Sequence, residues 1–85
     1  RRKLNKDFEK QIYTSKKNVE LVLAKIYDID DEDIQKEYMS AFNNVVCSYD
    51  QLKNDYELVG FNDNSDKLIA AYNLAFSTFE SEFEI

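Results

Sequence analysis

The sequence predicts an all-α protein folded as an antiparallel up-down-up three-helix bundle. The chain has no proline and a single glycine, Gly60, among 85 residues, whereas a β domain needs such residues at most of its hairpin turns. Apolar residues recur at spacings of three and four along three segments, which is the period of an α-helix. The two links between these segments are short, and short links favour antiparallel neighbours.

The first helix is expected over about residues 4–27. Its apolar stripe would face the core, and two further apolar residues, Tyr13 and Leu21, fall on the opposite side. The stripe consists of Leu4, Phe8, Ile12, Ser15, Val19, Val22 and Ile26.

The second helix is expected over about residues 31–59. Acidic residues at positions 30–33 supply side-chain acceptors and negative charge where free backbone N–H groups favour them. Gly60 would end the helix in a left-handed conformation and bring Phe61 against Tyr56. The core stripe, widened by Phe42, consists of Ile34, Tyr38, Ala41, Val45, Tyr49, Leu52 and Tyr56.

The third helix is expected over about residues 65–83, after a polar link that supplies a capping residue. Leu74 and Ile85 fall off its core stripe. Because so short a chain can bury only one core, residues 1–85 are predicted to form one domain. The stripe consists of Leu68, Tyr72, Ala75, Phe79 and Phe83, flanked by Ala71 and Phe76.

No catalytic, cofactor-binding or metal-binding constellation is expected. The chain has no histidine, one cysteine (Cys47) and one glycine, so the usual general bases, zinc ligand sets and phosphate-cradling loops are missing. The alternating acids that begin at Asp28 imitate a calcium loop, but Asp33 stands where that loop needs glycine and Met39 where it needs glutamate. The chain is therefore predicted not to be an enzyme.

The location of the protein is only weakly indicated. No apolar run is long enough to span a bilayer, no signal-peptide pattern is present, and a lone cysteine excludes an intramolecular disulfide. The cytoplasm is favoured. Because the sequence begins at Arg1 rather than methionine, a secreted or surface-exposed location stays open.

Charge is unevenly distributed along the chain. Residues 1–25 hold eight basic and three acidic residues, whereas residues 26–85 hold three basic and fourteen acidic residues. In an up-down-up bundle, the first link would meet the end of the third helix, so their carboxylates would gather in one acidic pole. This pole would suit a partner with a basic surface, or it would only keep the protein in solution. It comprises Asp28, Asp30, Asp31, Glu32, Asp33, Glu80, Glu82 and Glu84.

A second candidate binding surface is an apolar strip. Met39 and Val46 flank the core stripe of the second helix one heptad apart, and a partner helix or a second copy of this chain could cover them.

The sequence thus predicts a non-catalytic module that docks a partner protein through Met39 and Val46 or through the acidic pole. An alternative is an acidic inhibitor or immunity-type protein that blocks a basic or nucleic-acid-binding surface by charge mimicry. A third is a structural segment of a larger helical protein. The net charge of −6 argues against direct nucleic-acid binding. No membrane partner is expected, and a homodimer stays open.

Overall fold

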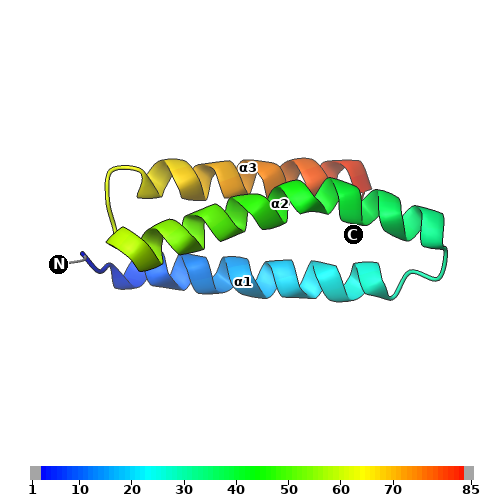
Figure 1. Cartoon of the computed structure of the whole chain (residues 1–85), viewed down its shortest axis with the longest axis horizontal. Helices are drawn as coiled ribbons and strands as arrows, with labels where there is room; N and C mark the ends of the chain where they lie inside the picture. The colour runs from blue at the N-terminus through cyan, green and yellow to red at the C-terminus, as the bar shows by residue number, and fades with distance from the viewer. Residues whose placement is uncertain (1–2, 84–85) are drawn as a thin grey trace.

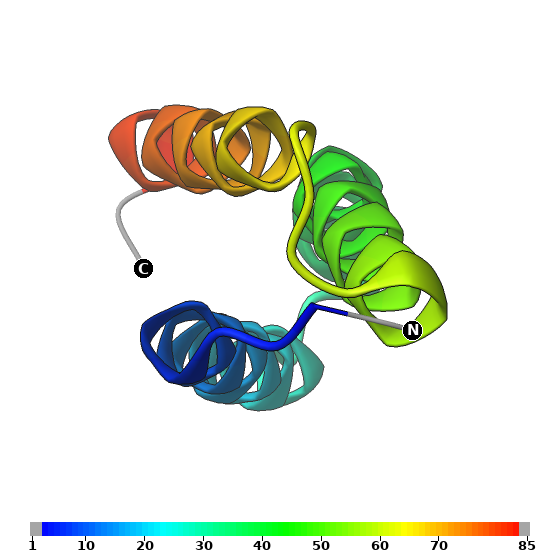
Figure 2. The same ribbon diagram turned by 90° about the vertical axis from the view of Figure 1, so that its left-hand side faces the viewer.

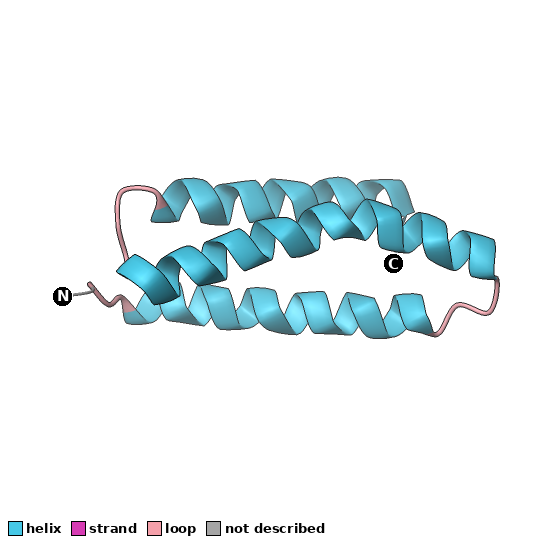
Figure 3. Ribbon diagram, viewed as in Figure 1, coloured by secondary structure: helices cyan, strands magenta, loops and turns pink. Residues whose placement is uncertain are grey.

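The computed structural model describes residues 3–83 and contains three helices, α1 (Lys6–Tyr27), α2 (Glu32–Val59) and α3 (Ser65–Phe83). The chain runs along α1, returns along α2 and turns again into α3 (Figure 1; coloured by secondary structure in Figure 3). The molecule is a rod with principal extents of 48 × 18 × 17 Å. Residues 3–83 include no strand beyond an isolated bridge between Lys3 and Gly60, so the all-α prediction is confirmed there.

The start of α1 is set by Asn5 rather than by Leu4. The backbone of Asn5 is extended, and its side-chain Oδ1 accepts a hydrogen bond from Phe8 N at 3.0 Å, which satisfies one of the free donors of the first turn. Leu4 therefore precedes the helix and is 65 % exposed. Its expected place in the core stripe is wrong.

The start of α2 follows the prediction. Asp31 caps the helix, because its Oδ1 accepts hydrogen bonds from Asp33 N at 2.9 Å and Ile34 N at 3.2 Å. Capping therefore gives at least one carboxylate of the first link a local structural role.

Gly60 ends α2 with a positive φ, as predicted, but not in the left-handed helical conformation. Its φ is 74° and its ψ is −162°, a region that is almost restricted to glycine. A Cβ here would collide with the Lys3 carbonyl oxygen and would lie 2.7 Å from Lys3 N. The N-terminal segment lies against this backbone, with Phe61 N donating to the Lys3 carbonyl.

Phe61 and Tyr56, which a Schellman motif would bring together, both pack against Phe8. The Phe61 ring meets the Phe8 ring edge-on at a centroid distance of 5.2 Å, and the Tyr56 ring packs against it at 5.4 Å. The Tyr56 hydroxyl also accepts a hydrogen bond from Asn5 N at 3.1 Å. We call this end of the molecule the closed end; it comprises Lys3, Asn5, Phe8, Tyr56, Gly60, Phe61 and Asn62.

Asn62 organises the link between α2 and α3. Its side-chain nitrogen donates to Asp55 Oδ2 and to the Gly60 carbonyl, both at 2.8 Å, and its Oδ1 accepts from Asn64 N at 2.8 Å. Asn62 N in turn donates to the Ser65 hydroxyl at 2.9 Å, and Ser65 is 1 % exposed. The polar link is thus a fixed turn into α3.

The core is centred on α2, which packs against both other helices. No Cα atom of α1 lies within 8 Å of a Cα atom of α3. Phe8, Tyr49 and Phe79 are buried, as their places in the three stripes predict. The buried apolar cluster comprises Phe8, Val19, Val22, Ile26, Phe42, Val45, Tyr49, Leu52, Tyr56, Ile69, Tyr72 and Phe79.

Aromatic pairs run along the contact between α2 and α3. Phe42 and Phe79 have ring centroids 4.8 Å apart, and Tyr38 and Phe83 have theirs 4.7 Å apart. Such tilted and edge-on pairs add to the stabilisation that burial gives. Aromatic side chains of both helices therefore help to hold α3 to α2.

The far end of the rod is less complete. The Tyr38 hydroxyl donates a hydrogen bond to the Phe83 carbonyl at 3.5 Å, so α3 ends beside Tyr38. Tyr38 lies six residues, or roughly 9 Å, after the start of α2. The first turns of α2 therefore extend beyond α3 (Figure 1). Ile34, predicted to be core, is 44 % exposed because no helix covers it. We call residues 28–34 the tip.

Candidate interaction site

Within residues 3–83, no three carboxylate or thiol side chains gather closely enough to hold a metal ion, and Cys47 is exposed. Buried side-chain nitrogen and oxygen atoms there all have hydrogen-bond partners. None of the three helices described has both the length and the apolar character needed to cross a bilayer.

A groove runs between α1 and α3. Both helices pack on α2, and the end-on view shows them on either side of it (Figure 2). Two adjoining hollows of about 250 Å³ and about 450 Å³ share Asn18, Tyr72 and Asn73 and together form the α1–α3 groove. It is lined by Lys10, Gln11, Thr14, Ser15, Asn18, Leu21, Val22 and Lys25 of α1, and by Ile69, Tyr72, Asn73, Phe76, Ser77 and Glu80 of α3.

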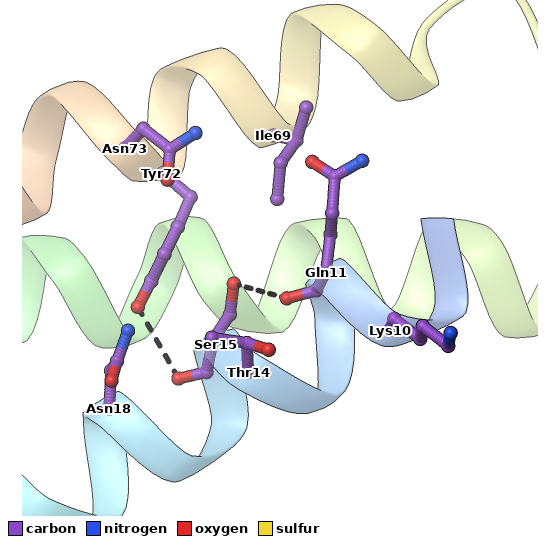
Figure 4. Close-up of a pocket in the computed structure, with 8 residues that line it drawn as sticks. All are labelled: Lys10, Gln11, Thr14, Ser15, Asn18, Ile69, Tyr72 and Asn73. Carbon is purple, nitrogen blue, oxygen red and sulfur yellow. Dashed lines mark hydrogen bonds between the residues drawn. The ribbon is translucent and has the colours of Figure 1, made fainter. Parts of the chain in front are cut away.

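Tyr72 forms the floor of this groove. Its ring is 2 % exposed, and its hydroxyl donates to the Ser15 carbonyl of α1 at 3.3 Å (Figure 4). Burial raises the pKa of Tyr72, and the hydrogen bonds with Ser15 and Asn18 offset only part of that rise. The phenol therefore stays neutral well above neutral pH and joins two helices whose backbones do not touch.

Ser15 explains how the tyrosine reaches α1. It occupies a core position in an otherwise apolar stripe and is 4 % exposed, with its own hydroxyl donating to the Gln11 carbonyl at 2.8 Å. A small side chain leaves room for the Tyr72 hydroxyl to approach the backbone, where a leucine would fill that space. A polar residue at a core position of an otherwise apolar stripe is the sequence signal from which the groove could have been predicted, although the groove was not among the features predicted from the sequence.

The walls of the groove are mostly polar and uncharged. Gln11 and Asn18 of α1 and Asn73 of α3 line the hollow that the close-up shows (Figure 4). Amide side chains carry both donors and acceptors, so they can bind a peptide backbone or polar side chains without a charge of their own. Leu21, which is 57 % exposed, adds an apolar contact at the rim, as its predicted position off the core allows.

Charge in the groove differs between its two walls. Lys10 and Lys25 lie on the α1 wall, and Glu80 lies on the α3 wall. An elongated ligand with acidic groups along one edge and a basic group along the other would match both walls.

The carboxylates of the predicted acidic pole lie in two places, because the first turns of α2 extend beyond the end of α3. Asp28, Asp30 and Asp31 lie exposed at the tip, whereas Glu80 and Glu82 lie exposed near the end of α3. Because α3 ends beside Tyr38, the two groups are separated by roughly two helical turns of α2, or about 10 Å. Glu84 lies outside the described residues. The described carboxylates thus form two groups, the acidic pole as a binding surface stays a prediction, and Glu80 also lines the α1–α3 groove.

The predicted apolar strip is partly covered by the protein itself. Met39 and Val46 are half-buried and pack against the core cluster. They offer a partner less apolar surface than their spacing indicated, and their role in binding stays a prediction.

Sequence reasoning missed the wall residues of the groove. Gln11, Asn18, Asn73 and Ser77 are polar residues on helix surfaces, and such residues are common on solvated faces. Only the arrangement of α1 and α3 brings them together.

Comparisons with protein-family models, curated proteins and solved structures found no match to this chain.

Proposed function

We propose that this chain is a non-catalytic protein-interaction module: one up-down-up three-helix domain that binds an elongated segment of a partner protein in the α1–α3 groove. The observation that supports this most is the groove itself, whose length from Lys10 to Lys25 spans roughly 22 Å of helix. That length corresponds to about four turns of a partner helix. Its floor is formed in part by the buried Tyr72 ring.

The chemistry of the partner segment follows from the walls. Lys10 and Lys25 favour acidic residues along one edge of the segment, and Glu80 favours a basic residue along the other. Leu21 and the half-buried Phe76 favour an apolar residue between them. The partner is thus an amphipathic segment with charges on two edges.

Charge mimicry by an acidic pole receives less support. The carboxylates at the tip stand apart from those on α3, and Asp31 is engaged in capping α2. A mimic of a phosphate row needs closely spaced acids on one surface.

We retain the cytoplasm as the proposed location on the basis of the single exposed Cys47, since thiols stay reduced there.

A displayed library of random peptides, selected against the full chain, tests the proposal. We expect enriched peptides to carry acidic residues and to lose at least about tenfold in affinity against Asn73→Arg, which places a bulky cation in the middle of the groove. Asn54→Arg on α2 is the matched control, because Asn54 is exposed and lies outside the groove. Its affinity should be unchanged.

Two results would overturn the proposal. One is the absence of any enriched peptide. The other is peptides that bind Asn73→Arg as tightly as they bind the original chain, with amide shifts in NMR spectra that map away from Asn18, Tyr72 and Asn73.

Reversal of Lys10 and Lys25 to Glu should select against acidic peptides, and unchanged binding would contradict the charge assignment.

A further inference from the structure

A different face of α3 carries a self-complementary pattern. Lys67, Ala71, Leu74, Thr78 and Glu82 are all exposed and follow one another at spacings of three and four, so they share one side of the helix. We call these five residues the Leu74 face. None of them lines the α1–α3 groove.

The centre of this face is an apolar knob beside a hollow. Leu74 is 69 % exposed, and it borders a hollow of about 420 Å³ between α2 and α3. The other walls of the hollow include three alanines, Ala41, Ala71 and Ala75. Such small side chains let a second helix approach closely.

Thr78 adds no unsatisfied polar group to this centre. Its hydroxyl donates to the Leu74 carbonyl of its own helix at 2.9 Å. The hydroxyl hydrogen is therefore used within α3, and covering the face would not require a donor or acceptor from a partner there. Covering Thr78 therefore does not carry the usual penalty for a buried, unpaired hydroxyl donor.

The register of the face decides its partner. Lys67 lies seven residues before Leu74 and Glu82 seven residues after Ala75, and Ala71 and Thr78 lie three residues before Leu74 and after Ala75, so both pairs are symmetric about the midpoint between Leu74 and Ala75. An antiparallel copy of α3 centred on that midpoint would place each Lys67 opposite a Glu82, and each small residue opposite another. A parallel copy would place like charges opposite each other, which is unfavourable.

We propose that the Leu74 face is a homodimer interface, in which α3 pairs antiparallel with α3 of a second copy about a two-fold axis and each Leu74 enters the hollow of the other copy. A two-fold interface requires one surface that complements itself. The Leu74 face meets this requirement through its charges, its knob and its hollow. The dimer lies outside the groove and is independent of the proposed function.

Sedimentation equilibrium on the full chain at low salt, from about 10 µM to about 1 mM, tests the dimer, because its population depends on concentration. We expect a concentration-dependent dimer for the original chain. Leu74→Asp should weaken it by at least about tenfold. Leu58→Asp is the matched control, since Leu58 is exposed on α2 and should leave the dimer intact.

A charge exchange distinguishes the register from a general effect on folding. Lys67→Glu and Glu82→Lys should each weaken the dimer, because each places like charges opposite each other at both ends, and the double variant should restore it. A chain that stays monomeric at every concentration, a dimer that survives Leu74→Asp, or a double variant that fails to recover would overturn the proposal. Peptide binding by Leu74→Asp separates a failure of the dimer proposal from a failure of the groove proposal. If this variant still binds the selected peptides, only the dimer proposal has failed.

Discussion

The two ends of the rod are held together in different ways. At the closed end, the backbones of Lys3, Gly60 and Phe61 lie directly against one another, and one ring from α2 and one from the link pack against Phe8 of α1. At the tip, the start of α2 continues without α3, and the Gln35 side chain joins it to the end of α1: Gln35 Nε2 donates to the Ile26 carbonyl at 3.2 Å and the Tyr27 carbonyl at 3.3 Å.

This difference indicates where the stability of the protein resides. Close backbone contacts tolerate few substitutions, whereas an end held by capping side chains can fray without loss of the core. We therefore expect changes at the closed end to affect global unfolding and changes at the tip to remain local.

The largest effect should follow loss of the Phe8 ring. Phe8 is 2 % exposed, so Phe8→Ala should lower the free energy of unfolding by about 3–5 kcal/mol. Ile34→Ala at the tip, where the side chain is 44 % exposed, should cost less than about 1 kcal/mol. Urea denaturation followed by circular dichroism compares the two. Equal losses would remove the distinction between the ends.

Gly60→Ala should have the next largest effect. The added Cβ would meet the Lys3 backbone at a φ that L-residues rarely adopt, and the expected loss is about 2–3 kcal/mol of unfolding free energy. Ser81→Ala, at an exposed position of α3, serves as the control and should change stability by less than about 0.5 kcal/mol. Equal losses of unfolding free energy from the two substitutions would contradict the close packing of Lys3 against Gly60.

The two helix caps sharpen the comparison further. Asn5→Ala and Asp31→Ala each remove a side-chain acceptor worth about 1 kcal/mol. Asn5→Ala should lower global stability by that amount, while Asp31→Ala should mainly speed amide hydrogen exchange in the first turn of α2. A global loss from Asp31→Ala that exceeds that from Asn5→Ala would reverse our assignment of the ends.

The smallest effect should be a dependence on high pH. Burial raises the pKa of both Tyr49 and Tyr72 above the ordinary tyrosine value of about 10, so the folded state holds its protons longer than the unfolded state does. The stability from these neutral phenols is complete below about pH 10 and falls as pH rises through the folded pKa values. Tyr72→Phe should flatten part of this fall, measured as urea midpoints from pH 8 to pH 11, which bracket that value. An unchanged slope would contradict the burial of the hydroxyl.

The sequence predicted the helices well because their signals are local. Spacings of three and four placed Phe8, Tyr49 and Phe79 in the core, and Asp31 was recognised as part of an acidic helix start. These features depend on residues within one or two turns, which are the distances over which helical periodicity and capping act.

The errors arose where distant segments meet. Leu4 and Ile34 matched the period of a stripe, but period alone does not reveal where a helix starts or whether a neighbour is long enough to cover it. The contact of Lys3 with Gly60 joins residues far apart in the chain and leaves no sequence pattern. The polar walls of the groove were missed for the same reason.

The most direct test of the central claim, that α1 and α3 pack on α2 and meet each other only across a groove, is a NOESY spectrum of the full chain. We predict cross-peaks from the Tyr72 ring to Ser15 and between the Phe42 and Phe79 rings. Hα protons of α1 and α3 should show no mutual cross-peaks, since their Cα atoms lie more than 8 Å apart. Cross-peaks between those Hα protons, or a Tyr72 ring with no contact to α1, would contradict the account.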